Sequence, residues 1–260
     1  TCTYLVFPKD EEELKTIIKK LKETNTKYFI LGNGSNIILS MTHYDGVVIK
    51  LDNLNKVTYE GNVVTAGAGC SLIKLSLDTI NKGLSGLEFA SGIPGCVGAS
   101  TAMNAGAYNS DMSQVVKSVK VLTDTCEIKI LNNQELKYSY RDSFLKQNKD
   151  YIVLSTTFKL TEGNIELMKE QVEERRNKRL AAQPFNMPNA GSVFRNPENM
   201  YAGELIEKMN LKGYNINDAE VSMKHANFIV NKGNATFTFS GGNIILNNKS
   251  LRKCLIHNVD

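Results

Sequence analysis

Apolar positions follow helical spacing over the first clear element of the chain. Leu14, Ile17, Ile18 and Leu21 recur at intervals of one turn, with lysines between them. Asp10 precedes this stripe, and Glu13 stands three residues after Asp10, which is the pattern of a capping box. The pattern predicts a helix that begins just after Asp10.

Shorter apolar runs follow this helix and predict strands. Residues 28–31 form a run that stops at Gly32, and residues 47–51 form another, which gives a β-α-β-β opening. A helix is predicted over residues 72–81. Further β-rich runs cover residues 57–59, 63–66, 115–122, 126–131 and 151–160. The mixture of helices, strands and long glycine-rich loops predicts an α+β fold.

A long polar pattern covers residues 164–182. A thin apolar stripe within it predicts a helix that bridges or lies on a surface, and Pro184 ends it. We therefore expect two domains: residues 1–160, with subdomains of 1–54 and 55–160, and a smaller C-terminal α+β domain over 161–260. In the second domain a short helix is expected over 201–209 and a strand over 227–230.

Composition narrows the class of protein. The chain has 260 residues, 42% apolar and 22% charged, as in an ordinary globular protein. A net charge of +4 is too small to indicate nucleic acid binding, and no run of apolar residues is long enough for membrane insertion. Five dispersed cysteines and three scattered histidines predict a reduced, cytoplasmic protein without a metal site.

Two glycine-rich loops are candidates for binding a diphosphate. The first contains Gly32, Asn33, Gly34, Ser35 and Asn36, whose backbone N–H groups can approach a phosphate closely. A simple strand-to-strand turn explains the same residues equally well.

The second loop is longer and richer in small residues. Its candidate binding residues are Gly92, Ile93, Pro94, Gly95, Gly98 and Ala99. A following helix start would offer N–H groups to an anion, although small residues also allow tight helix packing. Neither loop matches the glycine motif of a dinucleotide fold or a Walker loop.

Two further segments contain residues suited to catalysis. Arg141 beside Tyr140 can grip a carboxylate and stabilise an enolate, although an arginine next to Asp142 is more often part of a surface ion pair. Ser192 lies in a loop bounded by two prolines and is followed by Asn196. It can donate a proton, although such a serine is more often a turn residue. His225 is more often expected to be a structural or solvated histidine than a functional one, so a functional role for it is less favoured.

Five segments together resemble one known family. LGNGSN, GLEFASGIPGCVGASTAMNAGAY, YRDSF, PNAGSVFRNP and VSMKHANFIVNKGNAT occur in the order found in UDP-N-acetylenolpyruvoylglucosamine reductases. The resemblance covers about residues 4–236. It implies an FAD-binding domain of the vanillyl-alcohol-oxidase type, followed by a smaller substrate-binding domain.

The resemblance also implies a reaction and roles for individual residues. NADPH would reduce FAD, held by the two glycine loops, and the enolpyruvyl ether of a UDP-sugar would then be reduced to UDP-N-acetylmuramate for peptidoglycan synthesis. Arg141 would stabilise the enolate, Ser192 would protonate it, and Tyr140 and Asn196 would position the substrate. A cytoplasmic monomer is expected.

The resemblance fails at both ends of the sequence. The family has a further catalytic glutamate near its C-terminus, and no glutamate follows Thr236 here. The family also has a flavin-binding segment before the position of Cys2. We therefore expect weak FAD binding and low activity. The alternatives are an alcohol oxidase of the same flavin fold and a protein that binds flavin or UDP-sugar without catalysis.

Overall fold

The chain divides into two compact units, each of which is described by itself. The computed structural model describes residues 1–37, 43–235, 237–240, 243–246 and 249–251. One unit comprises Thr1–Gly34 and Thr42–Glu173, and the other comprises Ser35–Met41 and Glu174–Asp260. The division falls within helix α5 (Ile165–Ala182). The limits expected for the two domains stay a prediction.

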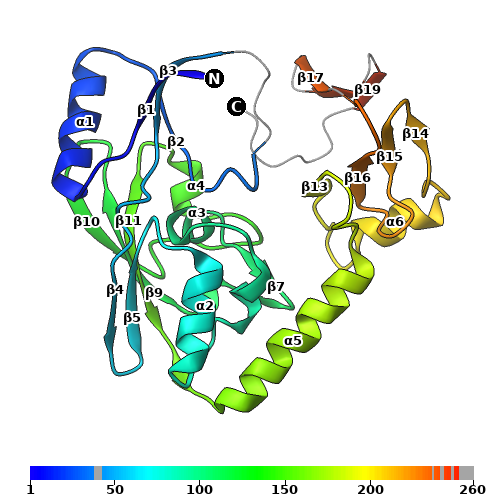
Figure 1. The fold of residues 1–260 in the computed structure, drawn as a ribbon. Helices are drawn as coiled ribbons and strands as arrows, with labels where there is room; N and C mark the ends of the chain where they lie inside the picture. The colour runs from blue at the N-terminus through cyan, green and yellow to red at the C-terminus, as the bar shows by residue number, and fades with distance from the viewer. Residues whose placement is uncertain (38–42, 236, 241–242, 247–248, 252–260) are drawn as a thin grey trace. The chain divides into compact units, whose positions relative to one another are not determined.

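The first unit opens with a small parallel sheet in the order β1-β3-β2 (Figure 1). Its strands are β1 (Cys2–Val6), β2 (Tyr28–Ile30) and β3 (Tyr44–Ile49). Helix α1 (Glu11–Glu23) joins β1 to β2, and Asp10 caps it by accepting a hydrogen bond from the backbone N of Glu13 at 2.8 Å. Leu14 and Ile18 are fully buried. The predicted helix, its cap and the two strands predicted after it, which correspond to β2 and β3, are therefore confirmed.

A larger antiparallel sheet forms the rest of the first unit, in the order β10-β9-β11-β5-β4. The strands are β4 (Val57–Glu60), β5 (Val63–Gly67), β9 (Val116–Leu122), β10 (Ile128–Asn132) and β11 (Ile152–Lys159). Val64, Val119 and Phe158 are fully buried in the core. Each of the five β-rich runs in the sequence corresponds to one of these strands.

Helices and short elements cover this sheet and position its loops. Helix α2 (Leu72–Asn81) has the bounds that the sequence predicts. Helix α3 (Val97–Ala102) packs on β11 and β5. The remaining elements of the unit are β6 (Leu84–Ser85), η1 (Glu88–Gly92), β7 (Gly106–Ala107), β8 (Ser110–Asp111), η2 (Met112–Gln114), α4 (Phe144–Gln147) and β12 (Thr161–Glu162). Strand β6 pairs with β12, and β7 pairs with β8.

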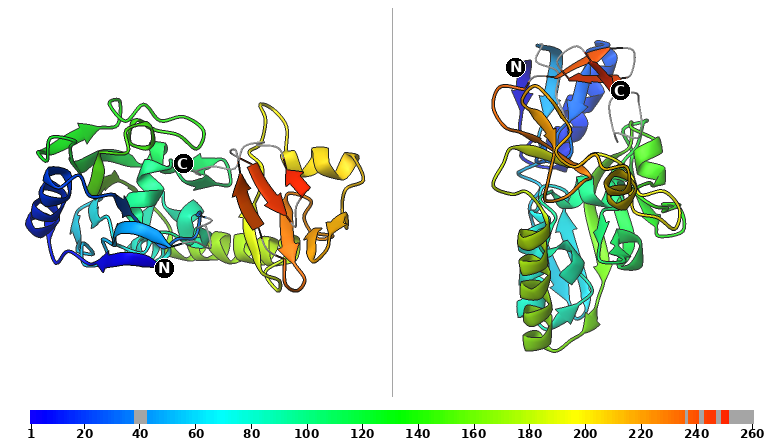
Figure 2. Two further views of the ribbon diagram at one scale, coloured as in Figure 1. Left: turned by 90° about the horizontal axis from the view of Figure 1, so that it is seen from above. Right: turned by 90° about the vertical axis from the view of Figure 1, so that its right-hand side faces the viewer.

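The second unit contains an antiparallel sheet in the order β13-β16-β15-β14, with helix α6 (Ala202–Lys208) near it (Figure 2). The strands are β13 (Asn189–Ser192), β14 (Asn215–Ile216), β15 (Ala219–Val221) and β16 (Phe228–Asn231). A separate sheet consists of β17 (Phe237–Ser240), β18 (Asn243–Leu246) and β19 (Lys249–Leu251). The predicted helices over 164–182 and 201–209 and the predicted strand over 227–230 are confirmed by α5, α6 and β16.

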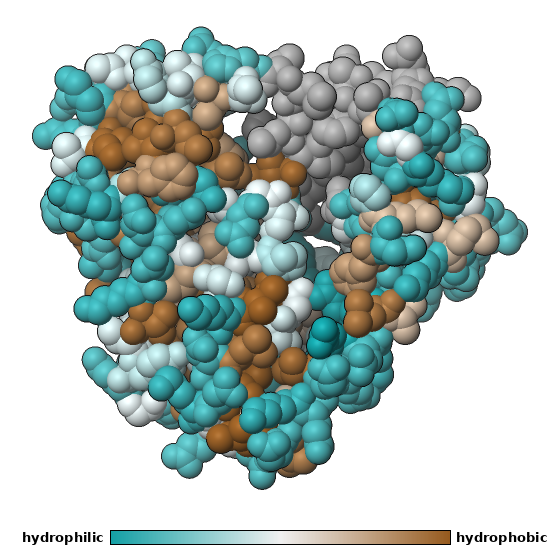
Figure 3. Space-filling model, in the orientation of Figure 1, coloured by the Kyte–Doolittle hydropathy of each residue, from teal (hydrophilic) through white to brown (hydrophobic). Residues whose placement is uncertain are grey.

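Apolar side chains reach the surface of the first unit around β1. Tyr4, Leu5, Phe7 and Phe29 are exposed there, and Figure 3 shows apolar surface over this part of the molecule. Across the described ranges, no helix has the length and apolar character needed to cross a membrane.

Candidate active site

A cavity of about 170 Å³ opens in the first unit, where segments of the parallel β1-β3-β2 sheet and of the larger antiparallel sheet contribute walls. Its lining is mostly apolar, with Asp52 and Lys149 as charged groups. The lining residues are Ile30, Leu31, Gly32, Leu51, Asp52, Ala68, Gly69, Cys96, Gly98, Ala99, Ala102, Lys149, Tyr151, Ile152 and Val153. Apolar walls with a few polar groups are typical of a site for an organic cofactor.

The two predicted glycine loops meet at this cavity. A Cβ atom on Gly32 would lie 2.9 Å from Sγ of Cys96 and 3.2 Å from Cβ of Ala99. A Cβ atom on Gly98 would lie 2.7 Å from Cβ of Ala68. Side chains at either glycine would therefore push apart the elements that form the cavity, which gives both positions a physical reason to be glycine.

The start of α3 differs from the sequence-based expectation. The backbone N of Val97 donates to the carbonyl of Cys70 at 2.8 Å, and the backbone N of Gly98 donates to the carbonyl of Ala68 at 2.9 Å. These two N–H groups are thus used within the protein and are not available to a phosphate. The contribution of Gly98 to the cavity is its lack of a side chain.

The other predicted cofactor residues lie in two turns. Gly92 ends η1, the backbone N of Ile93 donates to the carbonyl of Ala90 at 3.0 Å, and Gly95 accepts from the backbone N of Leu72 at 2.9 Å. Among the described residues, those that line the cavity do not include residues 92–95. In the first loop Gly34 has a φ of +70°, and the exposed residues Asn33, Gly34, Ser35 and Asn36 form the turn.

Several lining residues were missed by the sequence analysis. Asp52 follows β3, and its carboxylate lies 3.0 Å from Nζ of Lys50. Lys149 and Tyr151 lie just before β11. Their only signal in the sequence is a position next to a predicted strand. The shape of the sheets, which the local pattern does not encode, brings them to the cavity.

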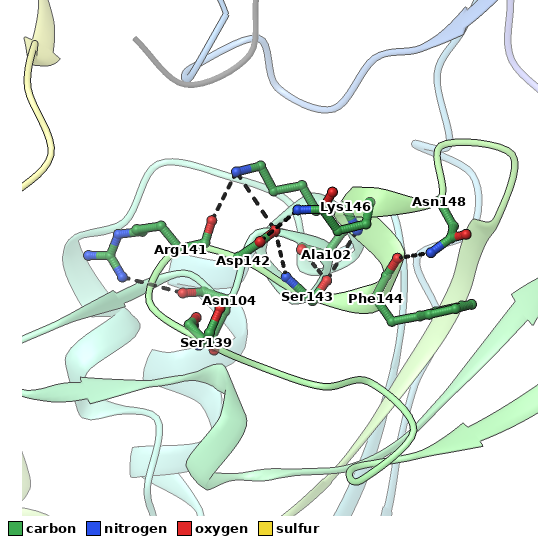
Figure 4. A network of polar contacts seen from close by, with 10 residues as sticks. Ala102, Asn104, Ser139, Arg141, Asp142, Ser143, Phe144, Lys146 and Asn148 are labelled. Atoms are coloured by element: carbon green, nitrogen blue, oxygen red, sulfur yellow. Dashed lines mark hydrogen bonds and ion pairs between the residues drawn. The ribbon is translucent and has the colours of Figure 1, made fainter. Parts of the chain in front are cut away.

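Arg141 occupies a tight turn in the first unit (Figure 4). Its φ is +57°, and Ser139 and Asp142 close the turn with backbone hydrogen bonds of 3.0 and 3.1 Å. The guanidinium donates to the carbonyl of Asn104 at 3.3 Å and to the carbonyl of Gly106. Its Cζ lies 5.2 Å from the centre of the Tyr140 ring, which is half exposed. The predicted pair therefore does lie together, and the arginine is anchored by backbone.

The residues after Arg141 hold the turn to its surroundings. Nζ of Lys146 donates to the carbonyl of Arg141 at 3.0 Å and lies 4.0 Å from Oδ1 of Asp142. The buried hydroxyl of Ser143 donates to the carbonyl of Ala102 at 2.6 Å, which ties the turn to the end of α3. Asp142 accepts from the side chain of Gln147 at 2.7 Å. These contacts fix the backbone that carries Arg141.

Ser192 lies at an irregular position of β13 in the second unit. The β13–β16 pairing changes register between Asn189 and Ser192, where Gly191 has a φ of +80°. Oδ1 of Asn189 accepts from the backbone N of Gly191 at 2.9 Å, which stabilises this bulge. Ser192 is exposed. Ser192 is thus an exposed residue on a strand that pairs with β16 on both sides of the bulge.

The remaining predicted residues of the second unit contact α6 and β16. Oδ1 of Asn196 accepts from the backbone N of Ala202 at 3.1 Å, at the start of α6. Nδ1 of His225 accepts from the backbone N of Asn227 at 3.2 Å, and its ring packs on Phe228. Burial, and secondly the charge of Lys212, lower the pKa of His225 below its ordinary value. Both residues therefore have structural partners.

Comparison with known families decides what these two units are. The model of an FAD binding domain family matches residues 2–132, and the model of the UDP-N-acetylenolpyruvoylglucosamine reductase C-terminal domain matches residues 183–239. A UDP-N-acetylenolpyruvoylglucosamine reductase of Clostridium perfringens (strain SM101 / Type A) is 44% identical over 232 residues, 89% of this chain and 76% of that protein. The chain belongs to the UDP-N-acetylenolpyruvoylglucosamine reductase family.

Other members of the reductase family agree. The enzyme of Caldanaerobacter subterraneus subsp. tengcongensis is 47% identical over 233 residues, 90% of this chain and 77% of that protein. The crystal structure of the Thermus caldophilus reductase has a TM-score of 0.75 at 34% identity, covering 89% of this chain and 82% of that chain. A glucose oxidase, Phl p 4, has a TM-score of 0.50 at 13% identity over 62% of this chain and 35% of its own, which shows a shared fold alone.

Membership of the reductase family confirms the predicted fold class. The chain combines an FAD-binding domain of the vanillyl-alcohol-oxidase type with the family's C-terminal domain, and both contain helices and strands. It is therefore a flavin-dependent oxidoreductase, and FAD is its cofactor. The alternative of an alcohol oxidase is not favoured by these relatives.

Proposed function

We propose that this chain catalyses the NADPH-dependent reduction of UDP-N-acetylglucosamine enolpyruvate to UDP-N-acetylmuramate, a step in making peptidoglycan precursors. The flavin, when bound, supplies the electron transfer from NADPH to the enolpyruvyl group. The protein's own residues bind the two substrates, stabilise charge and move one proton. The observation that carries the proposal is the anchored Arg141 guanidinium in a chain of this family.

Arg141 is proposed to stabilise negative charge on the enolpyruvyl carboxylate as an enolate develops. A guanidinium that two backbone carbonyls already hold does not have to reorganise when charge appears, and preorganised donors stabilise a transition state most. Arginine also matches a carboxylate with two parallel donors. Tyr140, whose ring contacts the guanidinium, is proposed to help position the substrate.

Ser192 is proposed to protonate the carbon next to that carboxylate. A hydroxyl is a weak acid, so its use depends on position more than on an altered pKa. Ser192 is exposed beside the bulge at Gly191, and its pairing with Phe228 fixes the strand that carries it. Asn196 is proposed to contact the substrate through its side-chain Nδ2, because its Oδ1 accepts from the backbone N of Ala202 at the start of α6.

The cavity of the first unit is proposed to bind part of the FAD. Its wall is closely packed at Gly32 and Gly98, where any side chain would collide with Cys96 or Ala68 and distort the cavity. Ala99 and the Gly32–Asn36 loop are proposed as the remaining contacts, together with those backbone groups of the Gly92–Gly98 loop that do not hydrogen-bond within the protein. Lys149 is a suitable partner for an anionic group of the cofactor, since it lines the same cavity.

The test is an anaerobic spectrum of the purified chain supplied with FAD. We expect a protein-bound flavin band that bleaches when NADPH is added and returns when the enolpyruvyl UDP-sugar follows. UDP-N-acetylglucosamine without the enolpyruvyl group is the matched control and should not restore the band. Bleaching without return would contradict the proposed substrate, and the absence of bound flavin would contradict the proposed cofactor cavity.

A further inference from the structure

Asn104 is a buried polar residue that the proposed reaction does not use. It follows α3 in the segment Asn104–Ala107, its side chain is 1% exposed, and its φ is +46°. Asparagine tolerates a left-handed backbone better than most residues, but a buried amide is costly unless its hydrogen bonds are made. Its neighbours therefore indicate what it is for.

The side chain of Asn104 joins three separate segments. Its Nδ2 donates to the carbonyl of Ser139 at 2.8 Å and to Oδ2 of Asp111 at 3.2 Å. Its Oδ1 accepts from the backbone N of Ser113 at 3.0 Å. Ser139 lies 35 positions after Asn104 in the chain and belongs to the turn that carries Arg141.

The backbone of the same residue contacts the guanidinium of Arg141 directly. The carbonyl of Asn104 accepts from Nη1 at 3.3 Å, and the carbonyl of Gly106, two residues later, accepts from Nη2. Figure 4 shows Asn104, Ser139 and Arg141 in this arrangement. Asn104 thus acts on Arg141 in two ways: its side chain holds Ser139 in the turn, and its carbonyl accepts a hydrogen bond from the guanidinium.

We propose that Asn104 is a positioning residue that sets the direction of the Arg141 guanidinium. The proposal rests on the proposed role of Arg141 in the reaction. A change that releases the turn at Ser139 would also loosen the two carbonyls that fix the guanidinium, because both sit on the segment that Asn104 orders. Small displacements of a charge-stabilising group reduce rates by roughly 10²-fold.

Two variants separate positioning from folding. Asn104→Gly keeps a residue that adopts positive φ and removes the side-chain hydrogen bonds. Asn104→Asp keeps an acceptor for Ser113 but places a carboxylate oxygen against the carbonyl of Ser139 and against Asp111, which repels it. Asn109→Gly is the matched control, since Asn109 is exposed, has a φ of +59° and lies in the turn between β7 and β8.

The first measurement follows the two steps separately by stopped-flow absorbance of the holoenzyme. Asn104→Gly should leave flavin reduction by NADPH within about 2-fold of wild type and should slow reoxidation by the enolpyruvyl UDP-sugar roughly 10- to 100-fold. In an Arg141→Ala background, the same change should add less than about 2-fold, because the two residues act as one unit. Equal slowing of both steps, or full slowing in the Arg141→Ala background, would overturn the proposal.

The second measurement does not depend on turnover. The ¹H–¹⁵N signal of the Arg141 side-chain Nε is assigned by its loss in Arg141→Lys. In wild type and in Asn109→Gly, this signal should be shifted away from the position of a solvated arginine. It should move to the position of a solvated arginine in Asn104→Gly. An unchanged signal in a folded Asn104→Gly variant overturns the proposal, and Asn104→Asp is measured in the same way if the glycine variant does not fold.

These measurements also separate two kinds of failure. If wild type is bleached by NADPH but never reoxidised by the enolpyruvyl UDP-sugar, the proposed function fails, and the Arg141 signal alone decides on Asn104. If wild type turns over and the Asn104 variants match Asn109→Gly in both measurements, the function stands and the positioning role fails.

Discussion

The side-chain amide of Asn227 forms two hydrogen bonds with the backbone of Phe194. The N of Phe194 donates to Oδ1 at 2.9 Å, and Nδ2 donates to the carbonyl of Phe194 at 2.8 Å. The carbonyl of Asn227 also accepts from the N of Val193 at 2.9 Å. Asn227 is only 4% exposed. One buried residue therefore fixes the two residues that directly follow Ser192.

Replacing Asn227 should loosen the segment that carries Ser192. Asn227→Ala leaves both backbone groups of Phe194 without this partner, and we expect a loss of about 1–3 kcal/mol of unfolding free energy. The substrate-dependent step should slow as well. Urea unfolding and stopped-flow absorbance check the two effects, with Asn215→Ala, an exposed asparagine in β14, as the control. A variant as stable as that control would contradict the bracing role.

Removing the hydroxyl of Ser192 should affect one half of the reaction. In Ser192→Ala we expect flavin bleaching by NADPH at the wild-type rate and product formation slower by roughly 10²- to 10⁴-fold, since general acid catalysis commonly contributes that much. Product is quantified after a single turnover. Ser222→Ala is unsuitable as a control because Ser222 is buried and accepts hydrogen bonds. Ser113→Ala is unsuitable because the hydroxyl of Ser113 donates to Asp111, which is itself a partner of Asn104. Thr58→Ala, in β4, is a better match.

If Ser192→Ala forms product at the same rate as Thr58→Ala, another group supplies the proton. If it also slows the bleaching by NADPH, the serine acts on the fold or on cofactor binding. Either result would remove Ser192 from the proposed chemistry.

Filling the cavity should block the cofactor. Ala99 lines it beside Gly32 and Gly98, and Ala99→Leu adds three carbon atoms to its wall. We expect FAD affinity to fall by at least roughly 10-fold, because overpacking at a close-packed wall costs about 1–3 kcal/mol. Titration of FAD fluorescence measures it. Ala182→Leu, at the exposed end of α5, is the control. Unchanged affinity in Ala99→Leu would place FAD elsewhere.

Stability should fall in mild acid because of His225. Its pKa is lowered from 6.5, first by burial and then by Lys212, so the unfolded chain binds the proton more tightly than the folded one. Protonation would also place a hydrogen on Nδ1, which now accepts from the N of Asn227. Unfolding free energy should therefore rise with pH through the range just below 6.5.

The pH effect is measured by thermal unfolding in buffers on either side of that range. His225→Gln, which carries no titrating group, should show a flatter dependence than wild type. Parallel curves for the two proteins would assign the acid sensitivity to other groups.

The sequence by itself determined the elements and the family. The capped stripe of α1, the bounds of α2 and the five strands of the larger sheet follow from spacing that each segment carries locally. The five motifs, in order, indicated a reductase that the relatives bear out. A local pattern is sufficient for the helices and strands because each depends mainly on residues close together in the sequence. The order of the motifs is read directly from the sequence.

Only the tertiary structure decided how those pieces are held. Asn104 binds Ser139 across 35 positions, and Asn227 binds Phe194 across 33, so neither asparagine differs in sequence from an ordinary turn residue. The carbonyls of Cys70 and Ala68 take up N–H groups at the start of α3 that the sequence left open for a phosphate. Hydrogen bonds between distant segments depend on which backbones the packed sheets bring within 3 Å or so of each other, and no local pattern encodes that choice.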